Sequence, residues 1–483
     1  MIRTLTTKEI VDNILSFKFA ITSLICLISI PLSVHFGRGN YERHLEEVRR
    51  TNELNQKRLK VADQWEDVGK IGLLISRRLS PLSIFCSGIA VAAGTTVEVT
   101  STRLPEATEN PYSSNPTFPL IADIDLTTVV KIILSLFAII FSYNAICGEK
   151  ERGTLRLLSS NQMPKHHIIL GKILGGYISL LIPFVTSFVI GIILLHITAP
   201  VSLAREDYAG LFLVFIVYLS YIMTFFMLGL FISSLTSSSS VSLMLSVFIW
   251  ACYVILIPKF SVVVATHLKP IPSLTEMNSQ ELAYFQEYER ALTLEEFKAL
   301  GAVSSSERDS LNLSEFTKRA KEFRTRLQQE LDQKLIRLRE HFLKRQWDQL
   351  GLALRLSRFS PASVFSYAVM NLSGTGFKAQ RRFSESVMKY RHEFVRVVEG
   401  KVAETTGGLT VYAPVSQAEE ATETMQKVTK LRLNLNIIPV YPQPREPLSI
   451  LLADALTDLG LLLLYSTLFF ACTYMAFLRY DVR

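Results

Sequence analysis

The segment Gly148-Glu-Lys-Glu-Arg-Gly-Thr-Leu-Arg-Leu-Leu158 decides the fold, because it is a short charged stretch between two long apolar runs. Residues 126–147 precede it and residues 169–197 follow it. A helix needs about 20 apolar residues to cross the core of a bilayer, and both runs reach that length. The charged segment is therefore expected at a membrane surface, where a soluble partner can push on it.

The composition of the whole chain agrees with a membrane protein. Of its 483 residues 49% are hydrophobic, and they are gathered in blocks between charged stretches. This pattern is typical of a mainly α, polytopic membrane protein with large soluble insertions. The net charge of +8 is explained by basic residues that flank membrane spans, so nucleic-acid binding is not expected. The five cysteines contain no CxxC pair, which disfavours a disulfide framework or a zinc site.

Six segments are long and apolar enough to be transmembrane helices. The fifth is the shortest and is expected to end at Pro258 and Lys259. Basic residues near both termini and in the loop 148–168 place these parts in the cytoplasm by the positive-inside rule. The six segments are Leu15–Phe36, Leu126–Cys147, Ile169–Ile197, Tyr208–Ser233, Val241–Ile257 and Leu448–Leu478.

These spans divide the chain into five parts. Residues 1–36 form an amphipathic helix at 5–16 and the first span, although residues 5–16 could also be a frayed start of that span. Two extracytoplasmic segments follow from the topology, 37–125 and 258–447. The spans two to five with the coupling loop 148–168 occupy 126–257, and the last span with a cytoplasmic tail occupies 448–483.

The extracytoplasmic segments are predicted to be mostly helical with some β-structure. Residues 71–93 are apolar but contain Arg77 and Arg78, each costing at least ~2.5 kcal/mol at bilayer depth, so they are expected to pack outside the membrane. Apolar residues three or four apart over 313–342 predict a long helix, packed on another helix or in a free coiled coil. Candidate partners are Tyr41–Trp65 and the helix around Phe377–Val397, and candidate strands are 408–413 and 430–441.

Four polar residues inside the spans have two interpretations. Ionisable groups at membrane depth usually face a bundle interior or water, so they could line a pathway or pair with another helix. Alternatively, the two aspartates, one helical turn apart, lie at the external interface and contact the soluble domain. The four residues are Ser142, Asn144, Asp454 and Asp458.

The sequence contains no recognisable nucleotide-binding or catalytic motif. It lacks the Gly-x-x-x-x-Gly-Lys-Ser/Thr loop that cradles nucleotide phosphates, and it lacks metalloprotease and serine-hydrolase motifs. We therefore expect a chain that is not itself an enzyme and binds no cofactor.

The region around the charged segment resembles the type 2 permeases of ATP-binding cassette (ABC) transporters. Gly148-Glu-Lys-Glu-Arg-Gly-Thr-Leu-Arg-Leu-Leu-Ser-Ser160 is similar to their signature, and Leu134-Ser-Leu-Phe-Ala-Ile-Ile-Phe-Ser142 and Ile169-Leu-Gly-Lys-Ile-Leu-Gly-Gly176 fit on either side. The pair Tyr143-Asn144 departs from the pattern, which has an aspartate nearby. A subgroup similar to gliding-motility and copper-maturation permeases is suggested by Phe477-Leu-Arg-Tyr-Asp-Val-Arg483, Arg355-Leu-Ser-Arg-Phe-Ser-Pro361, Leu372-Ser-Gly-Thr-Gly376 and Arg78-Leu-Ser-Pro-Leu-Ser-Ile84.

The resemblance implies a permease in the bacterial inner membrane, paired with an identical or homologous permease. Two separate ATPase subunits would drive it and would hold the ATP and Mg²⁺. The coupling segment would dock on the ATPase through charges of both signs, with Gly148 and Gly153 allowing a tight turn. One reading is export of a hydrophobic or lipid-linked substrate or a peptide. The alternative is mechanotransmission, in which ATP hydrolysis moves the extracytoplasmic domain against a periplasmic or surface partner. The coupling residues would be Gly148, Glu149, Lys150, Glu151, Arg152, Gly153, Thr154 and Arg156.

Overall fold

The computed structural model of the chain is mainly helical. Six helical runs are long and apolar enough to cross a membrane, which confirms the expected class of mainly α, polytopic membrane protein. The chain divides into two compact units, of which unit 1 comprises Met1–Ile255 and Ser360–Arg483 and unit 2 comprises Leu256–Phe359. The structure describes residues 2–101, 103–107, 125–154, 165–198, 203–304, 313–406, 435–442 and 445–479.

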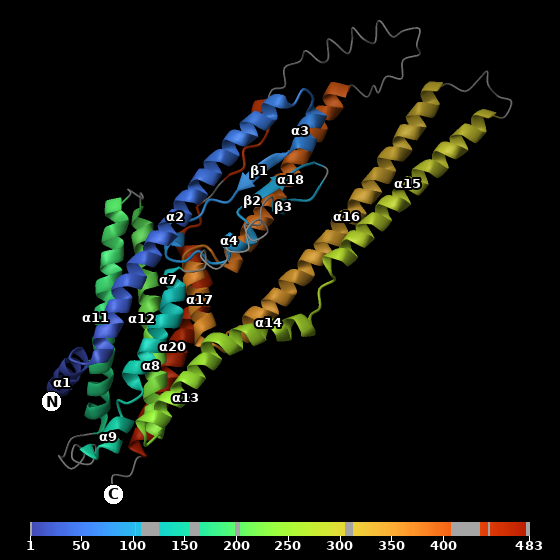
Figure 1. Ribbon diagram of the computed structural model, residues 1–483. Coiled ribbons are helices and arrows are strands. Elements are labelled where there is room, and N and C mark those ends of the chain that lie inside the picture. Colours follow the sequence, from blue (N-terminus) through green and yellow to red (C-terminus); the bar gives the residue numbers. More distant parts are fainter. Residues whose placement is uncertain are drawn as a thin grey trace. The chain divides into compact units, whose positions relative to one another are not determined.

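Long helices of unit 1 lie side by side in a bundle (Figure 1). A short helix, α1 (Ile2–Ile14), precedes them and is separated from the first span by a turn at Leu15 and Ser16. The remaining helices of this bundle are α2 (Phe17–Val61), α7 (Leu126–Val129), the π-turn η2 (Val130–Leu134), α8 (Ser135–Ser142), α9 (Cys147–Glu151), α11 (Lys165–Thr198), α12 (Arg205–Leu235), α13 (Ser239–Ala251) and α20 (Leu448–Leu478).

Helix α2 corrects the prediction for the first span. The sequence indicated a span ending at Phe36 and a separate charged helix from Tyr41, but α2 is one helix of 45 residues that contains Pro31. Gly37 does not interrupt it. A Cβ at this position would lie 1.9 Å from the carbonyl oxygen of Ile84, so the glycine permits a close contact between α2 and the short 3₁₀ helix that ends at Ile84.

The fifth span also continues beyond its predicted end. A π-turn, η3 (Cys252–Leu256), joins α13 to α14 (Ile257–Leu268), and Pro258 lies in the first turn of α14. A proline is tolerated there because the first N–H groups of a helix have no partner within the helix. The prediction that Pro258 and Lys259 end the helix was therefore wrong.

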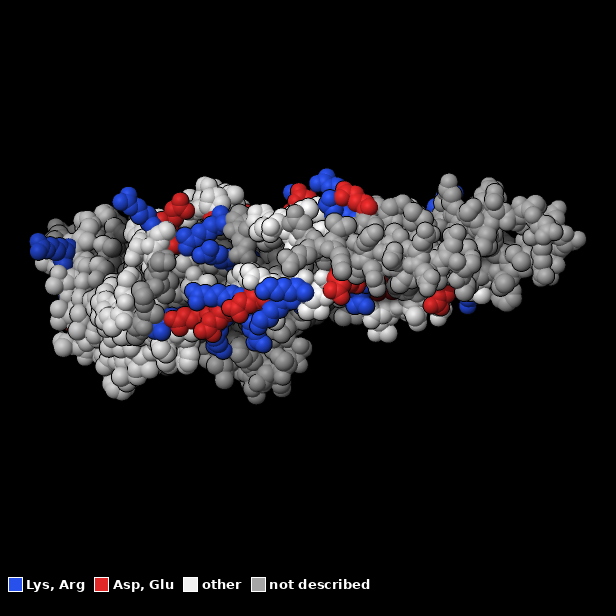
Figure 2. Space-filling view, turned by 90° about the horizontal axis from the view of Figure 1, so that it is seen from above, with Lys and Arg blue, Asp and Glu red and all other residues white. Residues whose placement is uncertain are grey.

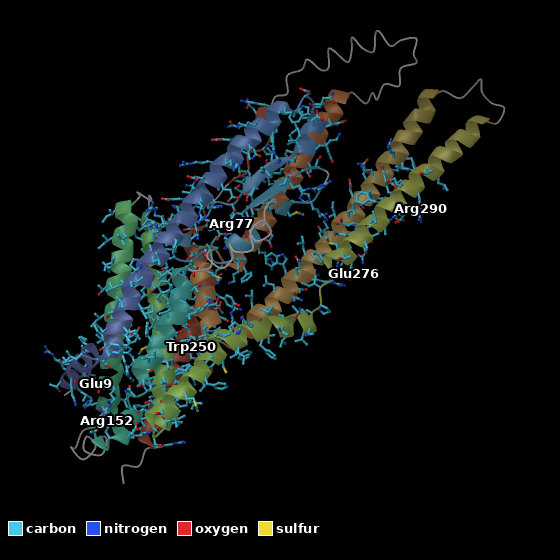
Figure 3. The ribbon with its side chains drawn as sticks, viewed as in Figure 1. Glu9, Arg77, Arg152, Trp250, Glu276 and Arg290 are labelled. Carbon is cyan, nitrogen blue, oxygen red and sulfur yellow. The ribbon has the colours of Figure 1, made fainter. Side chains whose placement is uncertain are left out.

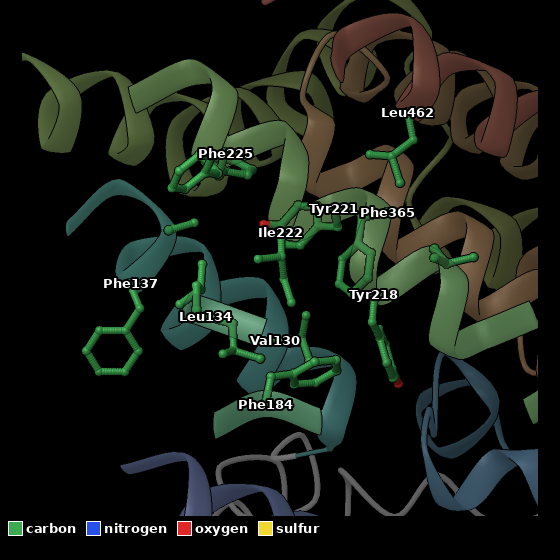
Figure 4. Packing of buried hydrophobic residues seen from close by; sticks show 14 of the residues in the cluster. Val130, Leu134, Phe137, Phe184, Tyr218, Tyr221, Ile222, Phe225, Phe365 and Leu462 are labelled. Atoms are coloured by element: carbon green, nitrogen blue, oxygen red, sulfur yellow. The ribbon is translucent and has the colours of Figure 1, made fainter. Parts of the chain in front are cut away.

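The core of the bundle is aromatic. Tyr221 of α12 stacks on Phe365 with ring centroids 4.0 Å apart, and Tyr218 and Phe184 are buried close by (Figure 4). Phe365 belongs to α17 (Pro361–Leu372), a short and almost wholly buried helix that packs against α12 and α20. Part of the chain that follows the fifth span is thus inside the bundle core.

A second, smaller core lies in unit 1 between short strands and α18 (Phe377–Thr406). The strands form an antiparallel sheet in the order β1-β2-β3, with Leu73 opposite Val99 and Val97 opposite Ala107. The sequence did not predict this sheet. Its elements and their neighbours are α3 (Trp65–Ile71), β1 (Leu73–Ser76), η1 (Pro81–Ile84), α4 (Ala90–Ala93), β2 (Thr96–Val99) and β3 (Glu106–Ala107).

The apolar stretch 71–93 is broken into these short elements and is not among the six candidate spans, as predicted. Arg77 is only 8% exposed and its guanidinium donates to Gln380 Oε1 at 2.8 Å and to the carbonyl oxygen of Gly374 at 2.5 Å. Burial lowers the pKa of Arg77 to about 10. Its charge is therefore kept in a packed region by hydrogen bonds to α18 and the turn before it.

The structure tests only one of the two segments that were predicted to be strands. Residues 408–413 lie outside the described part of the chain. In the second segment, 430–441, the described residues form the 3₁₀ turn η5 (Leu435–Ile437) and irregular backbone, so the strand prediction was wrong there.

Unit 2 consists of α14, α15 (Leu274–Ser304) and α16 (Leu313–Ser357). The helix predicted over 313–342 is present within α16, which packs against α14 and α15. Arg339 donates to Glu281 at 2.6 Å and Lys334 pairs with Glu287 at 3.1 Å across α15 and α16. Figure 3 labels Glu276 and Arg290 on the same helix, α15. The sequence predicted that the helix packs on another helix, but it identified neither α14 nor α15 as the partner. The candidates it offered were Tyr41–Trp65 and the helix around Phe377–Val397.

Candidate coupling site

The charged segment forms an elbow, defined here as residues 143–154, between α8 and the residues that precede α11. After a turn at 143–146 it contains the single helical turn α9, and its tip has Gly153 at φ +73°, a conformation that favours glycine. Gly148 lies within the helical turn α9. Of the two glycines predicted to allow a tight turn, only Gly153 has the backbone conformation that needs a glycine. Figure 3 shows Arg152 at the same end of the bundle as Glu9 of α1, with Arg77 farther along the bundle.

Glu149 fixes the elbow to α11 and, through it, to α1. The ammonium of Lys172, only 4% exposed, donates to Glu149 Oε1 at 2.6 Å and to Glu9 Oε1 at 2.8 Å. A buried ammonium between two carboxylates is held strongly, because removing it leaves charges in a poorly hydrated place. The other oxygen of Glu149, Oε2, is buried without a hydrogen-bond partner among the described residues.

The end of α12 accepts the elbow's hydrogen bonds. Ser233 Oγ accepts from the N–H groups of Ile146 and Cys147 at 3.1 and 3.0 Å. Lys150 Nζ donates to the carbonyl oxygens of Ser234 and Thr236, the latter at 3.1 Å. The start of α9 and the last turn of α12 are thereby joined.

The elbow also bonds to the start of α13 and to the start of α2. Glu151 accepts from the N–H and the hydroxyl of Ser239 at 3.1 and 2.7 Å. Lys18 of α2 donates to Asn144 Oδ1 at 3.1 Å, and its ammonium lies 4.4 Å from the centre of the Tyr143 ring. The elbow therefore contacts four helices directly, α2, α11, α12 and α13, and α1 through Lys172.

The end of the elbow is exposed from Glu151 onward, although the Glu151 carboxylate also bonds Ser239. Arg152, Gly153 and Thr154 are exposed, and the Thr154 hydroxyl reaches back only to the carbonyl oxygen of Glu149, at 3.4 Å. Arg156 lies outside the described residues. The eight predicted coupling residues thus separate into a group that joins the elbow to the bundle and a smaller exposed group.

The polar residues predicted within the spans do not come together in one place. Ser142 is buried where α8 meets Gly229 of α12 and donates to the carbonyl oxygen of Ala138 at 2.7 Å. Asp454 pairs with Arg382 at 2.6 Å and Lys378 at 3.3 Å, both on α18.

The second aspartate of α20 has a different environment. Asp458 is fully buried and accepts from Asn371 of α17 at 3.3 Å. Both aspartates therefore contact helices that precede α20 in unit 1. A role for them in a pathway stays a prediction.

Sequence reasoning missed the groups that receive the elbow. The run 233–240 carries no charge and shows no motif, yet Ser233, Ser234, Thr236 and Ser239 all bond the elbow. Lys18 and Lys172, the cations that bond the elbow, look in the sequence like ordinary basic residues at the ends of spans. A short hydroxyl-rich turn between two spans, at the same membrane face as a charged loop, is the pattern that could have indicated this contact.

Replacing Ser233 with alanine is expected to destabilise the protein by about 1–3 kcal/mol, because two buried N–H groups of the elbow lose their acceptor. Equilibrium unfolding of the detergent-solubilised chain measures the loss. Ser220→Ala is the matched control, since the Ser220 hydroxyl is exposed and bonds only within its own helix. Equal stability of the Ser233 variant and this control would refute the structural role of Ser233.

The chain belongs to the family of ABC-2 transporter proteins, since the family model with the description "ABC-2 family transporter protein" matches residues 4–482. No curated protein matches the sequence. The membership makes the chain a permease subunit of an ABC transporter, a multi-pass membrane protein that works with ABC ATPase subunits.

Proposed function

We propose that the elbow is where the ATPase subunits drive this permease. The supporting observation is a difference in bonding within the elbow: Glu149, Lys150 and Glu151 bond to helices of the bundle, whereas Arg152–Thr154 are exposed and, among the described residues, hydrogen-bond only within the elbow. A force on the exposed tip acts on several helices at once, because the tip is continuous with a turn bonded to all of them. Coupling of this kind needs a rigid element with two alternative packings.

In this mechanism, closure of the ATPase dimer moves the elbow and the bundle follows. Glu149 and Lys172 transmit the displacement to α11 and α1, and Lys150 and Glu151 transmit it to α12 and α13. ATP and Mg²⁺ are bound by the partner subunits, and this chain is not itself catalytic. Both termini and the elbow are cytoplasmic in this arrangement, with the chain in a bacterial inner membrane.

Replacing Arg152 with glutamate is expected to lower permease-dependent stimulation of the ATPase about tenfold or more, because like charges facing each other across an interface cost several kcal/mol. The measurement is ATP hydrolysis by the reconstituted complex. The folded state should be unaffected, since Arg152 is exposed.

Arg205→Glu is the matched control, because Arg205 is an exposed arginine at the start of α12 and the elbow bonds the other end of that helix. Full stimulation with Arg152→Glu would contradict docking at the tip. A comparable loss with Arg205→Glu would mean that net charge, and not the position of the arginine, matters.

The transported molecule is proposed to be hydrophobic or lipid-linked, or a peptide, and to move outward between two permeases of identical or homologous sequence. Six candidate spans support a path through the membrane. The subgroup similar to gliding-motility and copper-maturation permeases, with a large extracytoplasmic domain, is part of this proposal. The second core of unit 1 and the long helices of unit 2 are the parts that would form that domain.

Mechanotransmission is a second candidate, and α2 favours it. Lys18, near its start, contacts the elbow, while Arg58, near its end, pairs with Glu98 of β2 at 2.6 Å. One helix thus connects the coupling site with the sheet. Uptake of a labelled substrate by inverted membrane vesicles distinguishes the two functions, because only a transporter moves a molecule across.

Neither candidate function involves a nucleic acid. In the face shown in Figure 2, Lys and Arg side chains are interspersed with Asp and Glu. A nucleic-acid site is expected to show basic residues gathered on one face.

A further inference from the structure

A cavity of about 610 Å³ lies where α12 and α20 end, beside the elbow. Two of the described residues that line it are cationic, Lys150 and Arg479, and none is acidic. Its apolar wall includes Phe231, Leu235 and Met475, and its hydroxyl groups include that of Ser237. The cavity therefore combines positive charge with an apolar side.

The two cations have defined positions relative to the bilayer. Helices α12 and α20 are candidate spans that end at Leu235 and Leu478, so the cavity lies at the boundary between the bilayer and water. Lys150 is held at its edge by the carbonyl oxygens of Ser234 and Thr236, and Arg479 directly follows the last residue of α20. Long basic side chains at such positions place their charge at the level of the lipid headgroups.

Part of the apolar wall is exposed at the surface of two candidate spans. Leu235 is 61% exposed and Met475 is 52% exposed, although both belong to candidate spans. Only 22% of the apolar window of α20 is buried. An occupant that suits the whole cavity therefore carries a negative charge at one end and hydrocarbon at the other.

We propose that this cavity binds an anionic phospholipid, with the headgroup phosphate between Lys150 and Arg479 and an acyl chain along Leu235 and Met475. Charge complementarity and the position at the bilayer boundary both support this occupant. An acidic segment of a partner protein fits less well, because its backbone polar groups would face the apolar wall without hydrogen-bond partners. The proposal does not rest on the elbow being the docking site, but it requires the cavity to stay open when the ATPase subunits are bound.

The test is native mass spectrometry of the full-length chain, with and without its ATPase subunits, titrated with phosphatidylglycerol or phosphatidylcholine in mixed micelles. We expect phosphatidylglycerol to be preferred in both preparations. Arg479→Gln should weaken phosphatidylglycerol binding about fivefold, since one basic residue near anionic lipid contributes about that factor. Phosphatidylcholine binding should fall less, because the positive choline already offsets the charge of its phosphate. Arg479→Lys, which keeps the charge, should retain most of the preference.

Two further variants separate the cavity from general surface charge. Ala476→Phe fills the cavity without changing charge and should also reduce phosphatidylglycerol binding. Lys8→Gln removes an exposed positive charge from α1, which does not line this cavity, and should have no effect. The proposal is overturned if Arg479→Gln binds phosphatidylglycerol like the wild type, if Lys8→Gln weakens it equally, or if the ATPase subunits displace the lipid.

Discussion

Replacing Lys172 with methionine is expected to lower the free energy of unfolding by about 3–5 kcal/mol, because two partly buried carboxylates, Glu9 and Glu149, then lose their common cation. The ammonium is 4% exposed, and one oxygen of Glu149 is already buried without a hydrogen-bond partner among the described residues. Methionine has a similar length, so lost packing contributes little. Chemical denaturation of the chain in detergent measures the change, and the same variant should lose ATPase stimulation in the complex.

Two controls identify the cause of that loss. Adding Glu9→Gln and Glu149→Gln to Lys172→Met removes all three charges and should recover most of the stability, as expected when a buried ionic cluster is replaced by neutral groups. Lys334→Met breaks an ion pair whose lysine is 45% exposed and should cost at most about 1 kcal/mol. If the neutral triple variant is as unstable as Lys172→Met, the charges are not responsible.

Replacing Phe365 with alanine is expected to cost about 3–5 kcal/mol, because it opens a cavity in the aromatic core of the bundle. Phe365 is completely buried and touches Tyr218 and Tyr221 of α12. Helices in a membrane gain little from the hydrophobic effect, so the lost van der Waals contacts of this stack matter most. Thermal unfolding in detergent measures the loss.

Phe212→Ala is the matched control for this variant. Phe212 is on α12 as well, but it is 63% exposed and so faces outward from the bundle. Its removal should change the unfolding temperature only slightly. A similar effect of both substitutions would mean that α17 is not a structural part of the bundle.

How well the sequence predicted each span depended on what determines the ends of the helix. The bounds of α20 are those predicted, because a long apolar run needs no partner to be identified. The end of α2 could not be predicted, since Gly37 serves a contact with Ile84, which is 47 positions away. For α16 the apolar spacing indicated a packed helix, but periodicity on one helix does not identify the helix it packs against.

The coupling site shows the same limit. Its charged residues were evident because charge between two apolar runs is conspicuous in a sequence. Their partners were not, because Lys18, Ser233 and Ser239 come from other parts of the chain and each is ordinary in its own context. Which charges are bonded to the bundle depends on those partners, so only the structure separates Arg152 from Glu149 and Glu151.

The proline inside α2 has a mechanical consequence. Pro31 cannot donate the backbone hydrogen bond of a regular helix, so α2 bends most easily there. From Pro31 to Val61 the helix extends about 45 Å, given its rise of about 1.5 Å per residue. A change of about 5° in the angle at this hinge would carry the far end through about 4 Å, roughly the spacing between adjacent strands of a sheet.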